Sequence, residues 1–103
     1  MIGKLEELTL LACLRAGREA LASEIYVRVA EGQTKAAFGA VYTTLTRLKD
    51  KKFVSETSIA DNAGRSRRAF SITGQGKSAL AEALEASAKI GGWAAEGLNG
   101  LLA

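Results

Sequence analysis

The chain has 103 residues, the size of a single domain, and 48% of them are hydrophobic, as in a globular protein. It contains no histidine and a single cysteine, Cys13, which excludes an internal disulfide and a cysteine-rich zinc site and removes the commonest general base. We therefore expect a protein that is not an enzyme and has no metal or cofactor. The longest apolar runs are too short for a membrane span or a secretion signal, so the expected location is cytoplasmic.

Positive charge is concentrated in the middle of the chain. Residues 35–77 carry nine basic and three acidic side chains, against four and five in residues 1–34 and one and three in residues 78–103. The overall net charge of +3 therefore combines a strongly cationic centre with weakly acidic ends. A localised cationic region attracts polyanions, and double-stranded DNA is the partner that we expect.

A first helix is expected at residues 2–16, where leucines recur at helical spacing. Its second half is apolar on nearly every side, through Leu10, Cys13 and Leu14. A domain of this size has little interior with which to surround a helix, so we expect Leu10 and Leu14 to lie at the interface of a homodimer. The alternative is a monomer in which this helix is fully buried.

A second, shorter helix is expected to end at Gly32, with Ser23 and Glu24 in its first turn. Before it, the chain around Ala20 forms a short extended link. Tyr26 is expected to face outward. Residues 33–35 form a turn, and Thr34 is expected to cap the helix that follows.

The third helix is expected at residues 36–52. One stripe of this helix is apolar and should face the core: Phe38, Val41, Leu45 and Leu48. The opposite face carries small or polar residues: Ala36, Gly39, Ala40, Thr43 and Arg47. Such a face allows close approach to another surface, and helices in this order are typical of a helix-turn-helix, whose last helix enters the major groove.

A β-hairpin is expected next, with strands at residues 53–59 and 67–72 and a turn-forming loop at residues 60–66. Arg65, Arg67 and Arg68 cluster at its tip. We interpret the hairpin as the wing of a winged helix whose arginines contact phosphates or the minor groove. Alternatively, these arginines keep an exposed strand edge soluble.

A last helix is expected to begin at Thr73, its N-cap, and to be interrupted at Gly91 and Gly92. Small residues allow close approach of two such helices, so we expect four of its side chains at the dimer interface: Leu80, Ala83, Leu84 and Ile90. Trp93 follows and is a candidate for stacking on an aromatic ligand; the alternative is an anchor for packing. The predicted fold is thus mainly α with a small β-hairpin, a winged helix-turn-helix domain (1–73) followed by a dimerisation helix and tail (74–103).

These residues resemble the PadR-like transcriptional regulators. The matching segments are 5–11, 24–25, 39–48 and 64–73. The resemblance implies a homodimeric repressor that binds an inverted-repeat operator and is sometimes released by a small aromatic effector. It implies that Tyr42 and Thr43 contact DNA through the third helix, that Arg47 contacts the DNA backbone, and that the wing arginines also contact DNA. The chain departs from the family pattern at Ala22 and Ser23, where a glycine and an aromatic residue are usual.

Direct reading of bases should be sparse, because Thr43 is the main polar group on the outward face of the third helix. Most of the affinity is expected from phosphate contacts by Lys35, Tyr42, Arg47, Lys49, Lys51, Lys52 and the wing arginines. For the three lysines after Arg47, the alternative is that they complement the helix dipole. The alternative function is a winged helix that binds another protein, since fold does not determine function.

Overall fold

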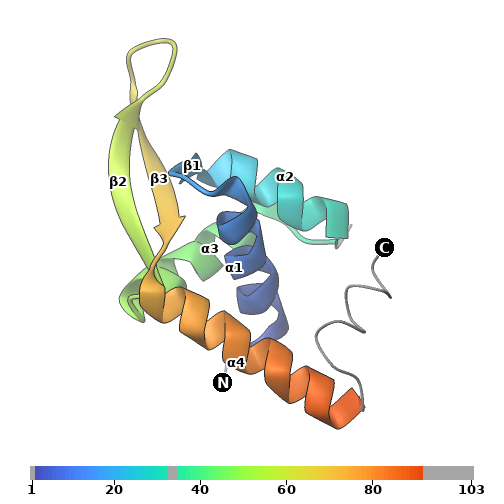
Figure 1. Cartoon of the computed structure of the whole chain (residues 1–103). Coiled ribbons are helices and arrows are strands. Elements are labelled where there is room, and N and C mark those ends of the chain that lie inside the picture. The colour runs from blue at the N-terminus through green and yellow to red at the C-terminus, as the bar shows by residue number, and fades with distance from the viewer. Residues whose placement is uncertain (1, 33–34, 92–103) are drawn as a thin grey trace.

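The computed structural model describes residues 2–32 and 35–91, which form a group of helices with a small antiparallel sheet at one side (Figure 1). In chain order, the elements are α1 (Lys4–Ala16), β1 (Ala20–Leu21), α2 (Ala22–Gly32), α3 (Phe38–Asp50), β2 (Val54–Ala60), β3 (Ser66–Ile72) and α4 (Gly74–Gly91). None of the helices in these residues is long and apolar enough to cross a membrane. The described part of the chain is therefore a winged helix-turn-helix with one additional helix.

Both ends of α1 are capped by recognisable local interactions. At its start, the Glu6 carboxylate accepts a hydrogen bond from the Gly3 backbone N–H at 3.0 Å, which satisfies a donor that no helical carbonyl reaches. At its end, Gly17 adopts a φ of 67° and its N–H donates to the carbonyls of Cys13 and Leu14. A left-handed residue of this kind is favourable for glycine and ends the helix where the sequence predicts.

The first three helices pack pairwise and enclose most of the core. Leu10 of α1, Ile25 of α2 and Leu45 of α3 are fully buried, and Phe70 of β3 closes the core from the side of the sheet. Leu10 therefore lies in the interior of its own protomer, and the prediction that it lies at a dimer interface was wrong. A fully buried leucine side chain contributes roughly 1.5–3 kcal/mol to folding, so burial of Leu10 within the protomer stabilises the fold.

The sheet has the strand order β1-β3-β2, with both pairings antiparallel. β2 and β3 pair along their full length from Val54 opposite Ile72 to Ala60 opposite Ser66, and their hairpin projects from the body as the wing (Figure 1). The expected extended link before α2 is also a strand, since Ala20 and Leu21 of β1 pair with β3. This third strand fixes the base of the wing to the start of α2.

α4 runs across the end of the molecule opposite the wing tip (Figure 1). The Thr73 hydroxyl accepts a hydrogen bond from the Gly76 N–H at 3.0 Å and donates to the Lys52 carbonyl at 2.7 Å, so Thr73 caps α4 as expected and joins it to the end of α3. Leu80 is only 3% exposed and belongs to the core of the protomer. Its expected role at a dimer interface was therefore wrong as well.

Three local expectations require correction. Phe38 is 44% exposed because it is the first residue of α3, before the helix has entered the core, so it is not a core residue. Tyr26 is not simply outward: it is half-buried, with its ring edge-to-face on Phe38 at 5.5 Å between centroids. α3 begins after Ala37, so Thr34 is not its N-cap. Thr34 and Trp93 lie outside the described residues.

Candidate nucleic-acid interface

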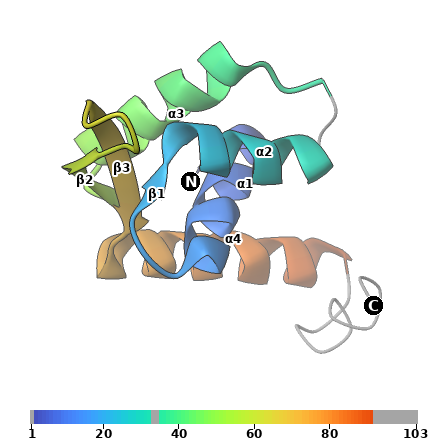
Figure 2. The same ribbon diagram turned by 90° about the horizontal axis from the view of Figure 1, so that it is seen from above.

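After the exposed Phe38 at its start, the first half of α3 presents mainly small side chains on its exposed face. Gly39, Ala40 and Thr43 are exposed, and Arg47 follows one turn later. Viewed from above, α3 lies on one side of the molecule and α4 on the other, with α1 and α2 between them (Figure 2). The small-residue face predicted from the sequence is therefore present on a side of the protomer that α4 does not cover.

The loop of the wing is shaped by Asp61. One carboxylate oxygen, Oδ1, accepts hydrogen bonds from the backbone N–H groups of Ala63 and Arg65, both at 2.9 Å, and Gly64 takes the positive φ of 79° that the turn requires. These bonds, led by the one from Arg65, lower the pKa of Asp61. The loop is thus built around an ionised carboxylate.

Two wing arginines lie beside the same carboxylate and remain exposed. Arg65 Nε is 3.3 Å and Arg67 Nη1 is 3.7 Å from Asp61 Oδ2, while their side chains are 76% and 44% exposed. Ion pairs at such exposure are weak, because water screens them. Both guanidinium groups therefore keep most of their donors available for an anion.

Arg68 has a different environment. Its Nε and Nη2 each donate to a carboxylate oxygen of Glu56 at 2.7 Å, and its Nη1 donates to the Tyr42 hydroxyl. Its guanidinium carbon also lies 4.8 Å from the centre of the Tyr42 ring and 5.3 Å from that of Phe70. The hydrogen bonds to Glu56 raise the pKa of Arg68. Arg68 therefore joins the wing to α3, and it is the least exposed of the three wing arginines.

Glu56 is the acidic centre of this link. Besides Arg68, its carboxylate pairs with Lys49 Nζ of α3 at 3.1 Å. The Arg68 hydrogen bond is the main cause that lowers the pKa of Glu56 from 4.5 to about 2. Glu56 thus stays ionised and connects β2, β3 and α3.

The remaining expected contact residues divide according to their partners. Lys51 Nζ is 2.7 Å from Glu6 Oε2, so its charge pairs with the start of α1. Burial alone would raise the pKa of Glu6, but the bonds from Gly3 and Lys51 outweigh it and lower this pKa. Lys35, Arg47 and Lys52 are exposed and form no ion pair with another described residue.

An aromatic cluster at the start of α3 did not emerge from the sequence. Phe38 contacts Tyr26 of α2 and also Tyr42, and the ring centres of Phe38 and Tyr42 are 6.0 Å apart. The only sequence signal was the spacing of Phe38 and Tyr42 by four residues, which places them on neighbouring positions of a helix. The cluster extends the exposed face of α3 with an apolar group.

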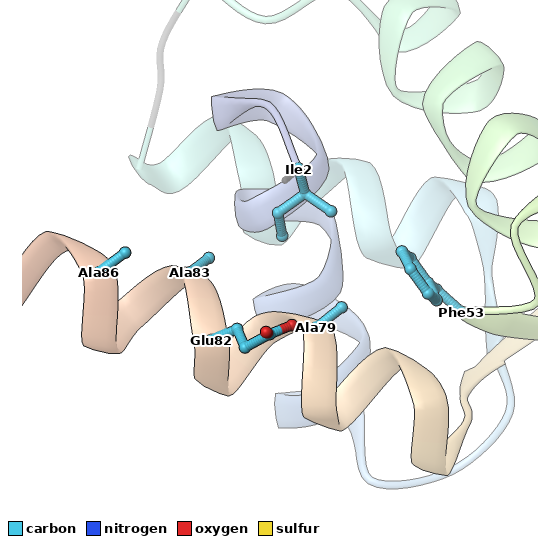
Figure 3. A pocket seen from close by; sticks show the side chains of 6 residues that line it. All are labelled: Ile2, Phe53, Ala79, Glu82, Ala83 and Ala86. Carbon is cyan, nitrogen blue, oxygen red and sulfur yellow. The ribbon is translucent and has the colours of Figure 1, made fainter.

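A hollow on the other side of the molecule lies between α4 and the start of α1. It has a volume of about 330 Å³ and is lined by Ile2, Phe53, Ala79, Glu82, Ala83 and Ala86 (Figure 3). The α4 alanines point toward Ile2 and Phe53, so the lining is mainly apolar (Figure 3). No group of three His, Cys, Asp or Glu side chains within residues 2–32 and 35–91 could hold a metal ion.

The helix order, the hairpin and the exposed α3 face define a winged helix-turn-helix protein. A family model described as the transcriptional regulator PadR-like family matches residues 10–82, and the chain belongs to this family. It is thus a transcriptional regulator of a DNA-binding family and not an enzyme, as the sequence resemblance and the missing catalytic groups predicted. No curated protein matches the chain significantly.

Solved structures agree with this assignment. A PadR-like transcription factor from Bacteroides fragilis is 32% identical, with a TM-score of 0.69 and coverage of 94% of this chain and 88% of that one. A PadR-like regulator from Bacillus cereus is 24% identical, with a TM-score of 0.67 and coverage of 95% and 90%. The Aeropyrum pernix ORC1 protein in complex with DNA is 20% identical with a TM-score of 0.60, over 69% of this chain and 21% of that one, and this likeness concerns the fold alone.

Proposed function

We propose that the protein is a homodimeric repressor that binds an inverted-repeat operator. In each half-site, α3 would enter the major groove and the wing would lie along the adjacent backbone or minor groove. The observation that carries this proposal is the exposed small-residue face of α3 on the same protomer as the exposed Arg65 and Arg67. An interaction module for another protein would be expected to present a larger apolar patch at this place.

Most of the affinity would come from phosphate contacts. The best candidates are the exposed cations that have no ion-pair partner among the described residues, Lys35, Arg47 and Lys52, followed by Arg65 and Arg67 of the wing, whose pairs with Asp61 are exposed. Lys49, Lys51 and Arg68 already pair with carboxylates and would contribute less. Thr43 and Tyr42 would supply polar contacts within the groove, and specificity would depend largely on half-site spacing and groove shape.

Dimerisation would use the side of the molecule away from α3. Leu14 and Ile90 are 41% and 88% exposed, and Ala83 and Leu84 are half-buried, so these four residues remain candidates for the interface. Segment 74–103 would then serve as the dimerisation region, although the first turns of α4 also belong to the protomer core. Sedimentation of the wild type and of Ile90→Lys tests this: a dimer that becomes monomeric supports it, and a wild-type monomer contradicts it.

The hollow beside α4 is where we expect a small aromatic effector to bind. Its walls offer apolar contacts from Ile2 and Phe53, and its volume of about 330 Å³ lies at the lower end of small-molecule sites. The expected ligand contact Trp93 lies outside the described residues. Titration of the protein–DNA complex with simple aromatic acids and amines tests the expectation. A ligand that binds in this hollow should release DNA from the wild type and should not release it from Phe53→Ala.

An electrophoretic shift with DNA from upstream of the protein's own gene tests the main proposal. Binding should weaken steeply as salt rises, because each phosphate contact releases counterions. Arg65→Ala/Arg67→Ala should weaken binding and reduce the salt dependence. Lys77→Ala removes one exposed charge from α4, beside the end of α1, and should change little. Absence of any shift at low salt would favour the protein-binding alternative. A reporter gene behind the same DNA distinguishes repression from activation.

A further inference from the structure

Glu56 is an acidic side chain within the most cationic part of the chain. Residues 35–77 contain three acidic residues, Asp50, Glu56 and Asp61. Asp61 shapes the wing loop, and Asp50 is exposed and pairs with no described cation. Glu56 is only 20% exposed and holds two cations, one from α3 and one from β3. A carboxylate at this place repels DNA, so its presence calls for a compensating function.

We propose that Glu56 is a positioning residue that fixes the wing against α3 and thereby increases the preference for operator DNA over unrelated DNA. This inference rests on the proposed function. Glu56 would act through Arg68 and Lys49, whose charges it pairs, and would itself make no contact with DNA. Glu56 would thus lower the affinity of the protein for DNA of any sequence and would hold α3 and the wing, the two DNA-contacting elements, at a fixed angle.

The geometry around Glu56 is suited to positioning. Arg68 holds the carboxylate through two parallel hydrogen bonds of 2.7 Å, an arrangement that fixes orientation as well as distance. The remaining Arg68 nitrogen donates to Tyr42 of α3, and Lys49 approaches the carboxylate from the same helix at 3.1 Å. The wing is therefore tied to α3 at two positions almost two helical turns apart. Without Glu56, Lys49 would lose its link to the wing, and Arg68 would keep only its contact with Tyr42.

The pairing also affects the competition between operator and unrelated DNA. Arg68 and Lys49 would reach for phosphates of any duplex if Glu56 were neutral, and one additional phosphate contact strengthens binding about tenfold near 0.1 M salt. That gain is independent of sequence. A wing with a variable angle would at the same time lose part of its fit to the operator, because specificity that depends on groove shape requires a rigid reader.

Glu56→Gln separates these effects, since glutamine keeps the shape and removes the charge. The dissociation constants of the full-length protein for operator DNA and for an unrelated duplex are measured over a salt series. We expect unrelated DNA to bind about tenfold more tightly, with a salt slope steeper by about 0.9, and the ratio of operator to unrelated affinity to fall about tenfold. Equal weakening on both duplexes, or an unchanged ratio, would overturn the inference.

Asp50→Asn is the matched control, because it removes one negative charge from the same cationic region at an exposed site without an ion pair among the described residues. It should strengthen binding to both duplexes by the same factor and leave their ratio unchanged. If Asp50→Asn lowers the ratio as much as Glu56→Gln does, the effect is general electrostatics and the inference fails.

A measurement without DNA tests positioning directly. Spin labels on Asn62→Cys in the wing loop and Arg28→Cys on α2, with Cys13 replaced by Ala, report the distance between the wing tip and the helices. The distribution should broaden in Glu56→Gln and stay narrow in Asp50→Asn. An unchanged distribution would overturn the inference even if DNA binding stands, whereas a wild type that binds no DNA refutes the proposed function, and the role in specificity with it.

Discussion

Gly76, in the first turn of α4, lies directly against the backbone carbonyl of Phe53. A Cβ at position 76 would overlap that oxygen and would also lie 2.9 Å from Cγ1 of Ile72. The same carbonyl accepts a hydrogen bond from the Thr73 N–H at 3.0 Å, so it cannot move without breaking the junction between α3 and α4. The absence of a side chain at position 76 therefore determines how closely α4 packs on the wing base.

We expect Gly76→Ala to lower the free energy of unfolding by about 1–3 kcal/mol, the usual cost of an extra group in a packed site. Gly74→Ala is the control, because a Cβ at position 74 would meet nothing within 4 Å. That variant should be as stable as the wild type or slightly more stable, since alanine favours the helix. Urea denaturation measures both. Equal stability of the two variants would show that the contact with Phe53 yields easily.

Lys52 adopts a left-handed backbone, with a φ of 67° at the end of α3. A side chain in this region costs roughly 1–2 kcal/mol, and glycine avoids that cost but loses more entropy on folding. We expect Lys52→Gly to raise the free energy of unfolding by about 0.5 kcal/mol relative to Lys52→Ala, which keeps the strain and also lacks the charge. Thermal unfolding of the pair measures the difference, and a less stable glycine variant would contradict it.

The helix-turn-helix and the wing were predictable because their signals are local. Apolar spacing, the Thr73 cap and the glycine at the end of α1 each depend on residues a few positions apart. The cap and the glycine were confirmed, and the apolar spacing of α3 was right for Val41, Leu45 and Leu48 but wrong for Phe38. Sidedness was not predictable in the same way. Leu10 and Leu80 could have faced a partner or the core, and only the packing of α1 against its neighbours decides that both are interior.

The link between Glu56 and Arg68 could not be predicted for a related reason. Glu56 lies opposite Phe70 in the hairpin, so Arg68 is its diagonal neighbour on the same face of the sheet. That relation depends on the register of β2 and β3, and a shift by one residue would place the two side chains on opposite faces. The sequence indicated a cationic wing, but it did not indicate which arginine would be paired within the protomer.

The low pKa of Glu56 predicts a specific loss of stability in acid. Its pKa falls from 4.5 to about 2 on folding, so the folded state binds the proton less readily than the unfolded state. The stabilisation is therefore fully present above about pH 4.5 and is lost as the pH falls toward about 2. We expect Glu56→Gln to remove roughly 1–2 kcal/mol of this acid-dependent term after screening by solvent.

Urea denaturation of the wild type and Glu56→Gln between about pH 2 and pH 6 measures the effect, because this range contains the interval between the folded and unfolded pKa values of Glu56. The two stability curves should converge as the pH falls. Parallel curves for Glu56→Gln would show that the pair with Arg68 contributes nothing to stability.

Asp61 allows the shape of the wing loop to be separated from its charge. Its Oδ1 accepts two backbone hydrogen bonds and its Oδ2 lies near Arg65 and Arg67. Asp61→Asn keeps an oxygen that can accept both backbone bonds, whereas Asp61→Ala has no such oxygen, and the two variants have the same net charge. Any difference between them in DNA affinity therefore reports loop geometry rather than electrostatics.

We expect Asp61→Asn to bind operator DNA at least as tightly as the wild type, because Arg65 and Arg67 are freed from a competing anion. Asp61→Ala should bind about tenfold more weakly than Asp61→Asn, because a loop that is no longer ordered would fail to hold one arginine against its phosphate. Fluorescence anisotropy with labelled operator DNA measures both. If the two variants bind equally, the arginines act as mobile charges, and the hydrogen bonds of Asp61 order the loop but do not contribute to DNA binding.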